Sequence, residues 1–160
     1  MSEEIISKSQ YQQALNTAIR LLTRRDHTNF EIRQKLKQRR FSSEAIRAAV
    51  AECERLNYID DERTARIFIG QQARRGFGFR RITIELKKKG LQGRRIQDIL
   101  EQQRAEIDER ENARRVLQKK MKSFERETDR KKRRDKIYRF LDYRGFNRSI
   151  ISELIREYIK

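Results

Sequence analysis

Residues 78–100 read GFRRITIELKKKGLQGRRIQDIL, and this stretch has two related copies in the same chain. Moving back by 50 residues gives TNFEIRQKLKQRRFSSEAIRAAV at 28–50, and moving on by 55 gives RRDKIYRFLDYRGFNRSIISELI at 133–155. Six apolar positions agree in all three copies without a gap, and in the middle copy they are Ile82, Leu86, Leu91, Ile96, Ile99 and Leu100. Self-similarity at such a period indicates an array of repeated structural units.

A second apolar pattern precedes each copy, with the spacing i, i+3, i+4 that marks one face of a helix. It reads Ala18-x-x-Leu21-Leu22, Ala65-x-x-Phe68-Ile69 and Ala113-x-x-Val116-Leu117. Proline is absent and helix-favouring residues dominate. We therefore predict an all-α fold of three tandem three-helix repeats, about nine helices, stacked into one elongated domain with modules at 11–57, 58–106 and 107–160.

The predicted helix ends carry recognisable signals. Thr28 and Glu31 have capping-box spacing, and Asn147 can cap the last helix. Arg40 stands where the other two copies have Gly90 and Gly145, so the second helix of the first module should end without a glycine. The third copy also contains a charged insert, 118–135, for which we expect longer helices.

The charge balance restricts the class of partner. The chain has 160 residues, 41 Lys plus Arg against 24 Asp plus Glu, a net charge of +17 and 36% hydrophobic residues. So little apolar material disfavours a compact two-layer enzyme, while the regular apolar spacing disfavours a disordered polycation. Nucleic acid, an acidic protein groove and anionic lipid remain as partners. The start, MSEE, has no signal-peptide character and no stretch could span a bilayer, so we expect a cytoplasmic protein without membrane contact.

The positive charge is concentrated in the second helix of each module. Blocks 31–40, 71–90 and 131–140 together hold 15 of the 17 net charges. If the modules stack with one handedness, these helices form a basic stripe that binds nucleic acid or a nucleoprotein filament. The candidate binding residues are Arg33, Lys37, Arg39, Arg74, Arg75, Arg80, Arg81, Lys87, Lys88, Lys89, Lys131, Lys132, Arg133 and Arg134.

Simpler interpretations remain open for several of these residues. Arg39, Lys89 and Arg144 each fall in a last helical turn, where a cation stabilises the helix dipole. The segment 74–81, RRGFGFRR, could hold a phosphate, but it lacks the strand and the Lys-Ser/Thr of a P-loop. A plain turn with Phe79 as core anchor is the stronger interpretation.

The sequence contains no evident catalytic or metal-binding constellation. His27 and Cys53 are the single residues of their type, and we expect both to be structural. The acidic run 60–62 falls at a predicted helix start, where acids complement the dipole. We expect no enzymatic activity, no metal and no cofactor.

With these motifs in place, the chain resembles the RecX family, bacterial regulators of the RecA recombinase. The resemblance rests on Leu22-x-x-Arg25-Asp26-His27-Thr28-x-x-Glu31-Ile32-Arg33-x-Lys35-Leu36, on Tyr58-Ile59-Asp60-Asp61-Glu62-Arg63-x-Ala65, on Gly78-x-Arg80-Arg81-Ile82-x-x-Glu85-Leu86-x-x-Lys89-Gly90-Leu91 and, more loosely, on Phe140-Leu141-x-x-Arg144-Gly145-Phe146. It implies a monomeric, non-catalytic protein of DNA recombination, repair and the SOS response. Such a protein lies in the groove of the RecA filament on DNA and inhibits ATP hydrolysis, filament extension and strand exchange.

Two other functions fit the residues less well. A general DNA- or RNA-binding protein would act on a filament by competing for the single strand, or for duplex DNA. A sequence-specific helix-turn-helix regulator needs a recognition helix that begins with Asn, Gln, Ser and Arg, and none of the predicted helices stands out in this way.

Overall fold

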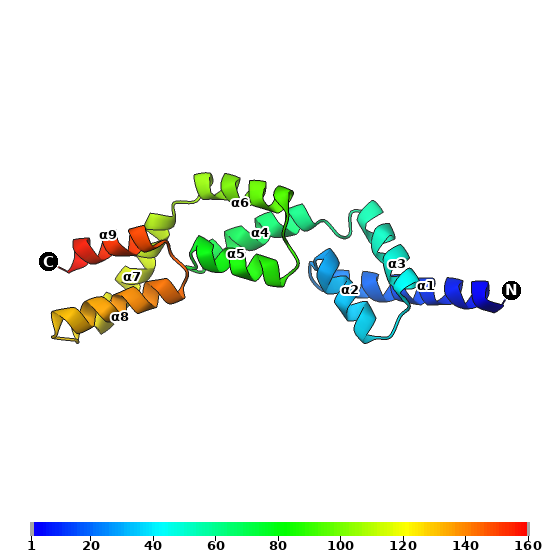
Figure 1. Ribbon diagram of the computed structural model, residues 1–160, viewed down its shortest axis with the longest axis horizontal. Coiled ribbons are helices and arrows are strands. Elements are labelled where there is room, and N and C mark those ends of the chain that lie inside the picture. Colours follow the sequence, from blue (N-terminus) through cyan, green and yellow to red (C-terminus); the bar gives the residue numbers. More distant parts are fainter. Residues whose placement is uncertain (1, 160) are drawn as a thin grey trace. The chain divides into compact units, whose positions relative to one another are not determined.

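The structure, a computed structural model, describes the backbone of residues 2–159 and the side chains of residues 8–159. Within residues 2–159 it contains nine helices and no strand (Figure 1). The helices are α1 (Ser2–Leu22), α2 (Asn29–Gln38), α3 (Ser43–Arg55), α4 (Asp61–Arg74), α5 (Phe79–Lys88), α6 (Arg94–Glu106), α7 (Glu109–Glu125), α8 (Arg130–Tyr143) and α9 (Arg148–Tyr158). The prediction of an all-α repeat fold is confirmed.

The chain divides into two compact units. The first contains the chain up to Ala65 together with Lys87–Gly93, and the second contains Arg66–Leu86 together with the chain from Arg94 onward. The end of α5 thus belongs to the first unit and the rest of that helix to the second. The module boundaries at 11–57, 58–106 and 107–160 stay a prediction.

The first unit is built on the bundle of α1, α2 and α3. The helix α1 packs mainly against α3, and α2 packs against both (Figure 1). Thr28 forms the predicted capping box at the start of α2, where its side chain accepts a hydrogen bond from the backbone N–H of Glu31. Cys53 is fully buried in the core of the bundle. Burial is the main cause that raises the pKa of its thiol, and the negative charges of Glu52 and Glu54 raise that pKa further. Its structural role fits this placement.

The second unit contains two further apolar layers. Phe79, Ile82 and Leu86 are buried along α5, and Ile96, Ile99 and Leu100 along α6. In the carboxyl-terminal part, α8 packs against α7 and α9 (Figure 1). Its core consists of Ala113, Val116, Leu117, Ile137, Leu141, Phe146, Ile151, Leu154 and Ile159.

The triplicated pattern is confirmed by burial. Of the 18 positions that the three copies align, all are buried except Phe41 and Ile155, which are half-buried. The alanines that begin the upstream triplets, Ala18, Ala65 and Ala113, are fully buried as well. The apolar spacing therefore identified the core-facing side of the second and third helices of each module.

The second helix of every module ends in a residue with left-handed backbone. The φ values are +63° at Arg40, +74° at Gly90 and +80° at Gly145. A Cβ at Gly90 would lie 2.3 Å from the Cβ of Phe30, and one at Gly145 would lie 2.4 Å from the backbone nitrogen of Arg81. These two turns therefore need glycine, because a helix start of the preceding module packs on them.

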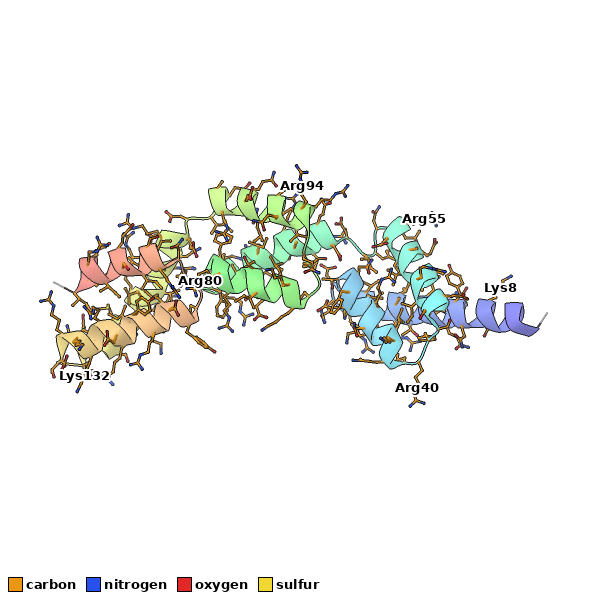
Figure 2. The ribbon with its side chains drawn as sticks, viewed as in Figure 1. Lys8, Arg40, Arg55, Arg80, Arg94 and Lys132 are labelled. Carbon is orange, nitrogen blue, oxygen red and sulfur yellow. The ribbon has the colours of Figure 1, made fainter. Side chains whose placement is uncertain are left out.

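The turn of the first module accepts a side chain, because among the described residues no preceding module packs on it. Arg40 takes the left-handed conformation that costs a non-glycine residue about 1–2 kcal/mol and directs its exposed side chain away from the bundle (Figure 2). The prediction that this helix ends without glycine is confirmed.

The charged insert 118–135 is largely helical, as predicted. The helix α7 has 17 residues and α8 has 14, against 14 for α4 and 10 for α5. Asp129 begins α8 by accepting a hydrogen bond from the backbone N–H of Lys132 at 3.0 Å. Among residues 2–159, no helix combines the length and the apolar character that crossing a membrane requires.

Candidate nucleic-acid interface

The start of α2 meets the end of α5 inside the first unit. The hydroxyl of Thr28 donates a hydrogen bond of 2.7 Å to the carbonyl of Lys89, and the Lys89 ammonium pairs with Glu31 at 2.9 Å. Burial alone would raise the pKa of Glu31, but its hydrogen bonds to Lys89 and Thr28 lower that pKa below the ordinary value. Lys89, a predicted binding residue, thus has a structural contact.

An equivalent joint lies in the second unit, between the start of α5 and the turn after α8. The N–H groups of Gly78 and Arg80 donate to the carbonyls of Arg144 and Gly145 at 2.8 and 3.1 Å. Gly78 corresponds to Thr28, and Arg144 corresponds to Lys89, by the same shifts of 50 and 55 that align the sequence copies. The two joints therefore repeat one arrangement.

The ion pairs of the two joints have opposite polarity. In the first joint the carboxylate, Glu31, lies at the helix start, whereas in the second joint the cation does. In the second joint, Arg80 at the start of α5 pairs with Asp142 at 2.7 Å. The Arg81 guanidinium lies over the rings of Phe77 and Tyr143, 4.7 and 5.0 Å from their centroids. Arg80 and Arg81, two of the predicted binding residues, thus have contacts with neighbouring residues, and their binding role stays a prediction.

Phe77, in the turn between α4 and α5, gathers three guanidinium groups. Arg81, Arg144 and Arg75 lie 4.7, 5.5 and 5.8 Å from its ring centroid. Phe79 two residues on is 2% exposed, as the core-anchor interpretation predicts. The segment is therefore an interhelix turn that also concentrates cations at the surface.

Next to this turn lies a hollow of about 290 Å³ with a strongly basic lining. Six cationic residues line it, together with Gly76, Val116 and Phe140: Arg74, Arg75, Arg115, Lys119, Lys120 and Arg144. No carboxylate is among the lining residues. Burial, and after it the repulsion from Arg81, lower the pKa of Arg144 below its ordinary value. The hollow thus concentrates positive charge that no acid in its wall balances.

The guanidinium groups of this hollow are held by backbone and amide oxygens. Arg144 donates to the carbonyl of Gly76 at 3.0 Å, and Arg115 donates to the carbonyl of Arg74 at 3.1 Å and to Asn112 at 3.2 Å. These bonds fix the positions of the cations and leave their charge uncompensated. The arrangement suits a multiply charged anion.

A second basic hollow, of about 480 Å³, lies between α8 and α9. Its lining combines four cations with two isoleucines: Arg130, Lys131, Arg134, Arg156, Ile155 and Ile159. Arg134 lies 3.6 Å from Asp135, and the neighbouring Arg133 donates to the carbonyl of Glu127. Lys131 and Lys132 are exposed in the first turn of α8.

The remaining predicted binding residues lie on the exposed sides of second helices. Lys37 and Arg39 are exposed near the end of α2, while Arg33 donates to Asn29 at 2.7 Å. Lys87 and Lys88 are exposed at the end of α5. The alignment of all three second helices along one side stays a prediction, as does the binding role of these residues.

The structure brings Arg74 and Arg75 together with four cations that the sequence reasoning missed as binding residues. Arg115, Lys119 and Lys120 come from α7, and Arg144 had been interpreted as a dipole partner. Their spacing i, i+4 and i+5 places the α7 cations on one side of the helix, but this signal is common on solvated helices. The packing of α7 against the α4–α5 turn was needed to give it meaning.

The residues judged structural in the sequence lie in structural positions. His27 is 4% exposed and its Nδ1 contacts the carbonyl of Arg25 at 2.9 Å. Asp60 accepts a hydrogen bond from the N–H of Arg63, and Asp61 and Glu62 lie in the first turn of α4. No group of three or more His, Cys, Asp or Glu residues within 2–159 is arranged to hold a metal ion.

Three-helix units with the same contact repeated at two joints place this chain among the helical-repeat proteins. Residues 14–53 match the sequence model "RecX, first three-helix domain", and residues 108–155 match "RecX, third three-helix domain". The chain belongs to the RecX family.

Individual relatives agree over nearly the whole length. Regulatory protein RecX of Legionella pneumophila (strain Corby) is 39% identical over 145 residues, which cover 90% of this chain and 93% of the relative. Regulatory protein RecX of Serratia proteamaculans (strain 568) is 34% identical over 166 residues, with 90% and 96% covered.

A solved structure has the same fold. The crystal structure of RecX from Lactobacillus salivarius superposes with a TM-score of 0.81 at 21% identity, covering 94% of this chain and 97% of that one. The chain is therefore a regulatory protein of the RecX type by sequence, and its all-α repeat fold agrees with a solved relative.

Proposed function

We propose that the chain is a non-catalytic regulator that binds in the groove of the RecA–DNA filament and inhibits the recombinase. It slows ATP hydrolysis, filament extension and strand exchange. The observation that carries this proposal is family membership over about 90% of the chain, with relatives that are named regulatory proteins. The cationic hollow and the exposed lysines of α5 support contact with DNA phosphates.

The mechanism needs a cationic chain that reaches more than one filament subunit at a time, which is the role that we propose for the three tandem modules. A protein that binds the clamped arrangement of subunits better than the mobile one shifts the population toward the clamped state. Because hydrolysis and strand exchange need subunit motion, both slow down without any chemistry by the regulator.

The test is the ATPase activity of the recombinase on a preformed single-strand filament, titrated with this protein. We expect inhibition at less than one regulator per recombinase subunit, and we expect it to persist when excess free DNA is added. Inhibition that excess DNA relieves would instead support a general DNA- or RNA-binding protein that competes for the strand.

Charge reversal tests the cationic contact. Lys87→Glu with Lys88→Glu should weaken filament binding at about 0.1 M salt, where the Debye length is about 10 Å, and should leave helicity intact. Arg24→Glu with Arg47→Glu makes the same change in charge at exposed positions of the first unit and serves as the matched control. Equal losses in the two variants would refute a specific role for α5.

A further inference from the structure

The exposed ring of Tyr143 is connected to the cationic hollow by a row of stacked groups. The Arg81 guanidinium lies between the rings of Tyr143 and Phe77, 5.0 and 4.7 Å from their centroids. Phe77 is followed by Arg144, at 5.5 Å, which lines the hollow. All these residues belong to the second unit, and Arg144 is shared by the row and by the wall of the hollow, so the two are adjacent.

Tyr143 is unusually exposed for an aromatic residue. The residue is 75% exposed although Arg81 covers part of it, against 44% for Phe30 and 54% for Ile84. The equivalent positions in the first and second modules hold Gln38 and Lys88. A large ring therefore occupies a position where the other copies have polar side chains, and the core gains nothing from it.

The backbone that carries the Tyr143 ring is held by contacts with Arg81. Arg81 donates a hydrogen bond of 3.3 Å to the carbonyl of Tyr143, and Gly145, two residues later, packs on the backbone of Arg81. Holding a ring in place before a ligand arrives lowers the entropic cost of stacking on it. With its backbone held and the Arg81 guanidinium over one face, the Tyr143 ring offers a platform on which a ligand can stack.

We propose that this surface is a binding site for single-stranded nucleic acid, with backbone phosphates in the six-cation hollow and an unpaired base stacked on Tyr143. The assignment rests on the proposed function, in which the chain contacts a filament on DNA. It adds that the bound nucleic acid is single-stranded and says which residues bind it. A hollow of about 290 Å³ is at the lower limit of ligand pockets, about 300 Å³, which fits phosphate groups better than larger moieties.

The combination of features distinguishes a single strand from other polyanions. Duplex DNA offers phosphates, but its bases are stacked inside and cannot reach an external ring. An acidic protein segment offers carboxylates but no aromatic bases. Proteins that bind single strands combine a positive groove with aromatic platforms, with sites of about 4–16 nucleotides, and the row from Tyr143 to Arg144 contains both elements.

The experiment measures fluorescence anisotropy of a labelled thymidine oligonucleotide without recombinase, over a series of salt concentrations. Tyr143→Ala should weaken binding roughly 5- to 150-fold, the effect of losing about 1–3 kcal/mol of stacking, and should leave the salt dependence unchanged. Tyr143→Phe keeps the ring and should bind like the original chain. Circular dichroism checks that each variant keeps its helicity.

The hollow is tested by Lys119→Gln with Lys120→Gln. The slope of log affinity against log salt should fall by about 0.7 for each phosphate that the variant no longer neutralises. Arg24→Gln with Arg47→Gln removes the same charge from exposed positions of the first unit and should leave that slope unchanged. Equal slopes in the two double variants would overturn the assignment of phosphates to the hollow.

Two further probes decide the strand form. A duplex of the same length and a glutamate-rich peptide of the same charge should bind more weakly than the oligonucleotide and should be insensitive to Tyr143→Ala. If either probe binds as tightly and depends equally on Tyr143, the proposal is wrong. The same holds if Tyr143→Ala leaves oligonucleotide binding intact.

The outcome is separable from that of the proposed function. A chain that fails to inhibit the recombinase ATPase yet binds the oligonucleotide through Tyr143 refutes the proposed function and keeps this site. A chain that inhibits the ATPase yet binds single strand and duplex alike refutes this site and keeps the proposed function.

Discussion

Replacing Gly145 by Ala tests the joint between the start of α5 and the turn after α8. Gly145 has a φ of +80°, and a Cβ there would lie 2.4 Å from the backbone nitrogen of Arg81 and 2.5 Å from its Cβ. Two backbone hydrogen bonds cross the same joint, from Gly78 to Arg144 and from Arg80 to Gly145. The added methyl group has to push the two backbones apart, so both bonds should lengthen.

The magnitude has two parts. A left-handed alanine costs about 1–2 kcal/mol, and the loss of two hydrogen bonds costs about 0.5–1.5 kcal/mol each. We therefore expect Gly145→Ala to lower the free energy of unfolding by about 2–5 kcal/mol. Gly93 is the matched control because its φ is +96° and a Cβ there meets no heavy atom within 4 Å. Gly93→Ala should cost only the conformational part, about 1–2 kcal/mol.

The assay is urea unfolding of the full chain followed by far-ultraviolet circular dichroism, with both variants measured beside the original chain. The joint predicts a difference of about 1 kcal/mol or more between the two variants, from the hydrogen bonds alone. Equal losses would show that Gly145 is needed only for its φ, and the argument that modules pack through this turn would be refuted.

Three other expected outcomes concern buried groups. Leu86→Ala should cost about 2–5 kcal/mol because Leu86 is 1% exposed; a urea-derived cost below about 0.5 kcal/mol would mean that the module alignment is misplaced. Burial, with a lesser contribution from the nearby Arg25, lowers the pKa of His27 below 6.5, so the unfolded chain binds the proton more tightly. The contribution of His27 to stability should then be constant above about pH 7 and decrease as the pH falls through 6.5. His27→Gln should flatten that part of the profile of melting temperature against pH, and an unchanged profile would contradict this prediction. Thr28→Val keeps the shape but removes the cap of α2 and the bond to Lys89, at an expected cost of about 1–3 kcal/mol; thermal unfolding at the original temperature would argue against this.

Much of the fold could be predicted from apolar spacing because it is a local property of each helix. The positions equivalent to Ile82 and Leu86 are buried in all three modules, and the capping box at Thr28 forms where the sequence places it. The insert 118–135 could be assigned to longer helices because it contains neither proline nor glycine.

The candidate site was less predictable because it depends on which modules touch. Arg80 has the same exposed character on a helical wheel as Lys87, yet only the packing of the α8 turn shows that it pairs with Asp142. The cations of α7 join Arg74 and Arg75 for the same reason. The exposed ring of Tyr143 has a sequence signal, a tyrosine where the other copies have polar residues, which becomes visible once the copies are aligned.

The two joints give the array a direction. The hydroxyl of Thr28, which caps α2, donates to the carbonyl of Lys89, and the start of α5 donates to the carbonyls of Arg144 and Gly145, whereas the start of α8 is capped by Asp129. The second and the third module thus each supply acceptors to the module before them in the chain. Removing the first module leaves the contacts at the starts of α5 and α8 complete. Removing the third module instead leaves the N–H groups of Gly78 and Arg80 at the start of α5 without their acceptors.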